Sequence, residues 1–263
     1  MVMMGYIDDA TSRIYGRFYD YEGTLPAMDS FKRYIEKYGL PMSVYLDRHT
    51  TYKSPRKLTE WDEVEGIEFL SQFERALKEL GVEVIHALSP QAKGRIERLF
   101  GVLQDRLVKE MRLRDIKTKE EANAFLEEYL RRYNERFVVC PANETDAHVK
   151  LPRHIDLDRY LCIKAERTLR KDNTIALDGR LYQIEQPGGK KVAVEERIDG
   201  SMLMISKGVS LKFREITERP RKAVAPKTDT RLFNRPPKPS KDHPWKRRWK
   251  DWMPARQHSA SVY

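Results

Sequence analysis

The sequence predicts an α/β region followed by a small antiparallel β-barrel and a basic tail. Up to residue 137, strand-like stretches alternate with amphipathic helical stretches, which is typical of layered α/β folds. From residue 167 the hydrophobic period changes to two, and turn-forming pairs recur about every ten residues, as in small barrels. From residue 218 neither hydrophobic period continues, and the sequence is rich in prolines and basic residues. The expected regions are a first domain over 1–139, a linker over 140–166, a barrel over 167–217 and a mostly disordered tail over 218–263.

Each element of the first region follows from its local pattern. Strands are expected where apolar residues alternate or run together, and helices where they recur three and four positions apart. Gly39 and Gly81 are stop signals, and Thr118 with Glu121 forms a capping box that satisfies free N–H groups. The predicted elements are, in order, a hairpin of Met1–Asp8 and Arg13–Tyr19 around an Asp-rich turn, a helix Ala27–Tyr38, a strand Met42–Leu46, a charged loop Arg48–Glu65, a helix with an apolar stripe from Phe69 to Leu80, a strand Val82–Ala87, a long helix from Ala92 or Lys93 to Arg112, and a helix from Thr118 to about Phe137.

The barrel is expected from short strands between turn pairs such as Asp178-Gly179 and Lys207-Gly208. Pro141 and Pro152 mark the preceding linker. Small barrels of this kind bind DNA or protein domains, and a structural clamp between domains is equally compatible with the pattern. The five predicted strands are Thr174–Leu177, Leu181–Ile184, Val192–Glu196, Met202–Ile205 and Val209–Phe213.

Charge and composition exclude several classes of protein. The chain carries 50 basic and 40 acidic residues, but 13 of the basic and only 4 of the acidic ones lie after residue 217, so the excess of positive charge is in the tail. The hydrophobic fraction of 40% suffices for a core, and no apolar run reaches the roughly 18 residues of a membrane span. Two cysteines, Cys140 and Cys162, do not make a disulfide framework, so we expect a cytoplasmic protein. They do not make a zinc-binding pattern either, so a metal site would use oxygen ligands.

Two acidic residues stand at the ends of predicted elements. Asp47 follows the strand Met42–Leu46, and ligands of open α/β sheets usually meet the carboxyl ends of strands. Glu97 lies one turn into the long helix. Two facing carboxylates suit a magnesium site for phosphoryl transfer. The alternative is a solvated carboxylate or a helix-end charge, and with 40 acids in the chain position alone does not decide.

The residues around these acids resemble a known superfamily. The strings Tyr45-Leu46-Asp47-Arg48 and Ser89-Pro90-Gln91-Ala92-Lys93-Gly94-Arg95-Ile96-Glu97-Arg98, with the hairpin turn upstream, are similar to the RNase H-like catalytic core of integrases and transposases, and in particular of bacterial insertion-sequence transposases. The resemblance covers about residues 1–140, and the barrel and His243-Pro244-Trp245 are also similar. It implies that Asp47 and Glu97 are the second and third of three acids, which hold two Mg²⁺ or Mn²⁺ ions for DNA cleavage and strand transfer during transposition.

The sequence departs from this family at the first acid. In the family that acid lies on a central first strand, ahead of the strand that here ends in Ile7-Asp8-Asp9, so it has no matching position. Asp8 or Asp9 could substitute, although Asp is favoured in such a turn for its own backbone hydrogen bonds. The expectation is an N-terminally truncated chain, inactive in strand transfer. One alternative is a non-catalytic DNA-binding remnant of a transposase. Another is an RNase H-like structure-specific nuclease, but the Pro-Gln-x-x-Gly-x-x-Glu string argues against the nuclease.

Basic and polar residues near the acids and in the tail are candidate DNA contacts. Around Glu97 they suit an approaching phosphate backbone, although they also suit a soluble helix face. In the tail, cations alternate with tryptophans, and this pattern suits binding to nucleic acid or to a partner subunit. The alternative is a tail that only keeps the protein in solution. The candidates are Gln91, Lys93, Arg95, Arg98, Lys246, Arg247 and Arg248. Expected partners are transposon-end and target DNA and further copies of the chain on DNA, in the bacterial cytoplasm and at the nucleoid, with no membrane and no small-molecule cofactor.

Overall fold

The structure is a computed structural model. It describes residues 1–46, 70–86, 90–152, 155–186 and 189–218 together with Ser240 and His243, the side chains of 90–93 excepted. The chain divides into two units, Met1–Arg219 and Pro220–Tyr263, and the fold below is that of the first. The predicted loop Arg48–Glu65 and nearly all of the predicted tail lie outside the described residues. No helix in the described ranges is long and apolar enough to cross a membrane.

The chain opens with the expected hairpin. Strands β1 (Val2–Ile7) and β2 (Ile14–Tyr19) pair antiparallel, and the N–H of Asp8 donates to the carbonyl of Arg13 at 2.8 Å to close the turn. Because hydrogen-bonded pairs alternate along an antiparallel ladder, this bond directs the N–H and C=O groups of Ile14 and Phe18 away from β1. The outer edge of β2 therefore needs other partners.

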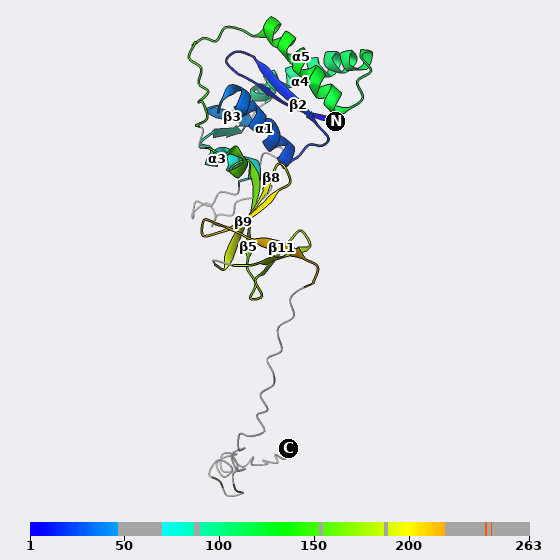
Figure 1. Ribbon diagram of the computed structural model, residues 1–263. Helices are drawn as coiled ribbons and strands as arrows, with labels where there is room; N and C mark the ends of the chain where they lie inside the picture. The colour runs from blue at the N-terminus through cyan, green and yellow to red at the C-terminus, as the bar shows by residue number, and fades with distance from the viewer. Residues whose placement is uncertain are drawn as a thin grey trace, which may run out of the picture. The chain divides into compact units, whose positions relative to one another are not determined.

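Helix α5 (Lys119–Phe137) supplies those partners (Figure 1). The Asn134 side chain accepts from the N–H of Ile14 at 2.9 Å and donates to its carbonyl at 2.8 Å. Asn123 does the same for Phe18, at 2.8 and 3.1 Å. An open strand edge is a template for unwanted pairing, and these two amides occupy it at two points. The term asparagine clamps denotes Asn123 and Asn134 with these four hydrogen bonds.

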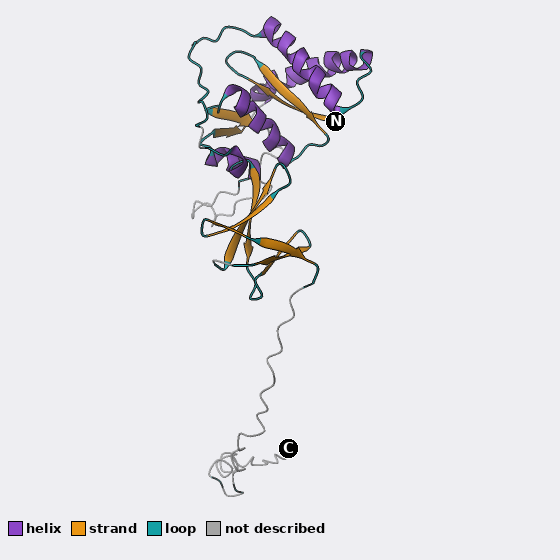
Figure 2. Ribbon diagram, viewed as in Figure 1, coloured by secondary structure: helices purple, strands orange, loops and turns teal. Residues whose placement is uncertain are grey.

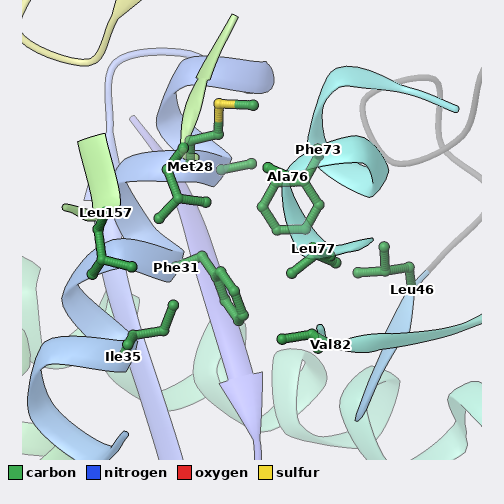
Figure 3. Close-up of a cluster of buried hydrophobic side chains, with 11 residues drawn as sticks. Met28, Phe31, Ile35, Leu46, Phe73, Ala76, Leu77, Val82 and Leu157 are labelled. Carbon is green, nitrogen blue, oxygen red and sulfur yellow. The ribbon is translucent and has the colours of Figure 1, made fainter. Parts of the chain in front are cut away.

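A parallel pair of strands follows. Helix α1 (Thr24–Tyr38) precedes β3 (Ser43–Leu46), and α3 (Gln72–Glu79) precedes β4 (Glu83–His86), which runs parallel to β3. α1 begins three residues before the predicted start, because Pro26 is tolerated in a first helical turn. These elements meet in one buried cluster (Figure 3), formed by Ala27, Met28, Phe31, Ile35, Leu46, Phe73, Ala76, Leu77, Val82, Leu157 and Leu161.

The two long helices form a second cluster with the hairpin. α4 (Pro90–Leu113) and α5 are joined by a short turn, and α5 starts at the predicted capping box of Thr118 and Glu121. The two helices lie beside the hairpin (Figure 2). Their apolar side chains pack on β1 and β2. The buried members are Ile14, Leu99, Leu103, Leu107, Met111, Ala122, Phe125, Leu126, Tyr129 and Leu130. The periodicity therefore located both helices and their buried faces, and the mixed α/β class is confirmed.

Two antiparallel sheets follow. One has the order β10-β9-β8-β5 and the other β11-β7-β6. Their strands are β5 (Cys162–Thr168), β6 (Thr174–Leu177), β7 (Arg180–Ile184), β8 (Lys191–Arg197), β9 (Met202–Ser206), β10 (Val209–Leu211) and β11 (Phe213–Ile216). The predicted single strand Val209–Phe213 is wrong, because the chain changes sheets at Lys212, so that β10 pairs with β9 and β11 with β7. Closure into a barrel and an RNase H-like core stay predictions.

The strand β5 lies partly in the segment expected to be a linker. A short 3₁₀ helix, η1 (Leu157–Arg159), precedes it, and Leu157, Leu161 and Cys162 are buried. The Gln72 side chain on α3 accepts from the N–H of Lys164 at 2.9 Å and donates to its carbonyl at 2.9 Å. The linker expected to reach residue 166 therefore ends earlier, because burial and these bonds fix β5 to α3. The term α3–β5 junction denotes these two bonds, and whether the barrel binds DNA, binds protein or clamps the domains stays a prediction.

Candidate functional site

The predicted catalytic edge lies where β3 and β4 end. Leu46 and His86 are register partners and the last residues of the two parallel strands. Asp47 directly follows Leu46 but lies outside the described residues. The structure therefore shows the strand end that leads to Asp47, and the role of Asp47 stays a prediction.

Glu97 lies on the first half of α4 with an exposed side chain. Its neighbour Leu99 is buried in the second cluster, which fixes this part of the helix against the hairpin. Among the side chains that the structure describes, none makes a hydrogen bond or ion pair with the Glu97 carboxylate. The described ranges contain no group of three His, Cys, Asp or Glu side chains that could hold a metal ion.

The two turn aspartates are both engaged. Asp8 accepts from the N–H of Ala10 at 3.3 Å and from the hydroxyl of Thr11, so its carboxylate holds the turn together. Asp9 bonds to Arg95 on α4: the Nη1 group of Arg95 lies 2.7 Å from Asp9 Oδ1 and 2.5 Å from the Asp9 carbonyl oxygen. The Asp8 carboxylate thus bonds within its own turn, whereas the Asp9 carboxylate bonds to α4.

The structure describes the side chains of only some of the candidate DNA contacts. Arg95 and Arg98 have exposed side chains, and Arg98 Nε donates to the carbonyl of Gly94 at 2.9 Å in its own helix. The backbone of Gln91 and Lys93 belongs to the start of α4, but their side chains lie outside the described residues. Lys246, Arg247 and Arg248 are likewise outside them.

Sequence reasoning missed a pair beside the strand end, formed by the half-buried His86 and the buried Glu74. His86 Nε2 lies 2.8 Å from Glu74 Oε1, and the other Glu74 oxygen accepts from the N–H of Ser71 at 2.6 Å. Ser71 and Glu74 form the capping box of α3, and this Ser-x-x-Glu spacing was the available signal. His86 Nδ1 is buried and has no hydrogen-bond partner in the described part of the chain.

A cavity of about 440 Å³ lies beside the hairpin turn. His148 joins two of its walls, since Nε2 contacts the Tyr34 hydroxyl at 2.8 Å and Nδ1 contacts Asp146 at 2.8 Å. Burial, and then the charge of Asp8, raises the pKa of Tyr34. The N–H of His148, together with its side chain, lowers the pKa of Asp146. Tyr34 is thus held as a neutral hydroxyl, which suits a structural link between α1 and the segment after α5 rather than a nucleophile.

Comparison with known proteins gives two curated relatives. A putative transposase, y4bF, of Sinorhizobium fredii (strain NBRC 101917 / NGR234) is 32% identical over 222 residues, which are 81% of this chain and 47% of that protein. The transposase for insertion sequence IS1202 of Streptococcus pneumoniae is 33% identical over 191 residues, 71% of this chain and 39% of that protein. The chain thus spans less than half the length of either relative.

Two further comparisons complete this result. No family model matches the sequence. Among solved structures, a chain of the simian T-cell lymphotropic virus intasome in complex with PP2A regulatory subunit B56 gamma is 17% identical, covers 82% of this chain and 73% of its own length, and has a TM-score of 0.41.

Proposed function

This chain is a homologue of bacterial insertion-sequence transposases, and on that premise we propose that it binds DNA and contributes Asp47 and Glu97 to a divalent-metal site for DNA cleavage and strand transfer. The observation that carries the proposal is the exposed carboxylate of Glu97 on α4, which is flanked by Arg95 and Arg98 and bonded to no side chain that the structure describes. Basic side chains next to a metal-binding acid suit a DNA phosphate that approaches the ions.

The residues present are compatible with a magnesium or manganese site. Hard divalent cations take oxygen ligands and keep some water, and Glu97 offers two oxygens that no described side chain occupies. Asp47 would hold the same ions from the end of β3. Two bound ions would supply activation of the attacking oxygen and stabilisation of the leaving oxygen in an in-line displacement.

The chain's own residues would bind and orient the DNA. Arg95 and Arg98 would contact phosphates beside Glu97, Gln91 and Lys93 would do so from the start of α4, and Lys246, Arg247 and Arg248 would add contacts from the tail. Several copies would assemble on the DNA. Arg95 and Arg98 are the best supported of these contacts, because both side chains are exposed and lie in the same helix as Glu97.

We also propose that this chain by itself does not complete strand transfer. The reaction uses three acids in the family it resembles. Asp8 bonds within its own turn and Asp9 bonds to Arg95, which supports a structural role for both rather than that of the first acid. Strand transfer on terminal-repeat DNA with Mg²⁺ or Mn²⁺ should therefore be undetectable. Turnover that disappears in Asp8→Ala would show that Asp8 is the first acid.

Metal binding tests the proposed site directly. We expect Mn²⁺ titrated into the chain, followed by calorimetry, to bind more weakly to Glu97→Gln and Asp47→Asn than to the wild type, by about tenfold, as for loss of a metal-site group. Glu127→Gln is the matched control, since Glu127 is an exposed acid on α5. If Glu97→Gln and Glu127→Gln bind Mn²⁺ equally well, Glu97 is not a metal ligand.

A further inference from the structure

The turn between β1 and β2 is held in place both from within and from outside. Asp8 ties its own turn residues together, and the bond from its N–H to the carbonyl of Arg13 closes the hairpin at 2.8 Å. From outside, the N–H of Val139 donates to the carbonyl of Thr11 at 2.9 Å. A turn fixed in this way presents Asp9 in one position.

Asp9 uses one end of the Arg95 guanidinium and leaves the other open. The Nη1 group has two N–H bonds to donate, and the carbonyl and carboxylate oxygens of Asp9 lie 2.5 and 2.7 Å from it. Among the residues that the structure describes, none hydrogen-bonds to Nε or Nη2 of Arg95. The Arg95 side chain is 52% exposed, so this remaining edge is accessible to a ligand.

We propose that Asp9 is a positioning residue for DNA, which holds Arg95 so that its Nε and Nη2 groups bind a phosphate beside Glu97. The Nε and Nη2 edge of a guanidinium matches two oxygens of one phosphate. A long side chain that is already ordered loses less entropy on binding. The inference rests on the proposed function, since it takes DNA to approach α4 at Glu97.

An opposite role for Asp9 makes the proposal testable. The Asp9 side chain is 80% exposed and negatively charged, so an Asp9 that only shields Arg95 would repel the phosphate. Removal of a shield strengthens DNA binding, whereas removal of a positioning contact weakens it. The two roles therefore predict effects of opposite sign.

The experiment measures DNA affinity by fluorescence anisotropy with a labelled duplex oligonucleotide of random sequence, over a series of salt concentrations in Mg²⁺. The variants are Asp9→Ala, Asp9→Asn, Arg95→Ala and the double Asp9→Ala/Arg95→Ala. Asp105→Ala is the matched control, because the exposed Asp105 pairs with Lys109 in the same helix. Exposed ion pairs contribute little to stability, so all variants should melt at the wild-type temperature.

We expect Asp9→Ala to weaken binding by about three- to fivefold, the range of one exposed charged contact. Asp9→Asn should bind like the wild type, because its amide oxygen still accepts from Nη1. Arg95→Ala should lower the slope of log affinity against log salt by roughly 0.9, for one lost phosphate contact. The double variant should bind like Arg95→Ala, because Asp9 acts through Arg95.

Two results would each overturn the positioning role alone. In the first, Asp9→Ala binds DNA as tightly as the wild type or more tightly. In the second, Asp9→Ala weakens DNA binding by the same factor in the Arg95→Ala background as in the wild type. A wild-type chain that does not bind the duplex at all would overturn the proposed function, and the positioning role with it. Asp105→Ala is expected to bind like the wild type in every case.

Discussion

Substitution of Asn134 by alanine should destabilise the first unit by about 2–4 kcal/mol. The change removes the two hydrogen bonds between the Asn134 amide and the backbone of Ile14, at 2.9 and 2.8 Å. Ile14 is 2% exposed, so water replaces these bonds poorly, and a buried group left without its partner costs about 1–3 kcal/mol. Two such groups, partly relieved by local relaxation, give the estimate.

The assay is equilibrium unfolding in urea, combined with hydrogen exchange at the Ile14 amide. Asn134→Asp keeps an acceptor for the Ile14 N–H but sets a carboxylate oxygen against the Ile14 carbonyl, where the Asn134 amide had donated, so it should recover little of the stability lost in Asn134→Ala. Asn143→Ala is the control, since Asn143 is exposed and accepts from the N–H of Thr145 at 3.0 Å. If Asn134→Ala unfolds within 0.5 kcal/mol of the wild type, about the effect of an ordinary surface change, the asparagine clamps do not stabilise the hairpin.

Two further predictions concern the α3–β5 junction. Gln72→Ala should cost about 1–3 kcal/mol in urea unfolding, because it removes both side-chain bonds to the backbone of Lys164; a loss below that of the control Asn143→Ala would contradict this. Burial acts to raise the pKa of Glu79, but hydrogen bonds from Lys164 and Arg75 outweigh it and lower the pKa. Glu79 should therefore stabilise the fold above its unfolded pKa of 4.5 and lose that contribution as the pH falls through its lower folded value. The unfolding midpoints of the wild type and Glu79→Gln should differ at neutral pH and converge in acid, and a difference that stays constant with pH would refute this.

Local signals predicted most of the first region. The capping box at Thr118 and the apolar stripes of α4 and α5 depend on residues within a turn or two of each other, so the sequence alone reveals them. The hairpin of β1 and β2 is equally local. The apolar stripe predicted helix α3, although its N-cap at Ser71 could be located only from the Ser-x-x-Glu spacing.

Long-range pairing explains what the sequence did not reveal. β5 pairs with β8 and is bonded to Gln72 on α3, 92 residues away, and no local pattern encodes such a partner. The change of sheets at Lys212 likewise depends on which strands are free to pair. For the candidate site, the sequence located Glu97 on α4, but the bond between Asp9 and Arg95 joins residues 86 positions apart.

The asparagine clamps have a consequence for the order of events during synthesis. Asn134 is 120 residues after Ile14 and Asn123 is 105 residues after Phe18, so the hairpin leaves the ribosome long before its outer edge can be covered. Throughout that interval β2 presents unpaired backbone groups to other nascent chains, the hazard of any open edge. The hairpin is thus made before the helix whose asparagines cover its outer edge.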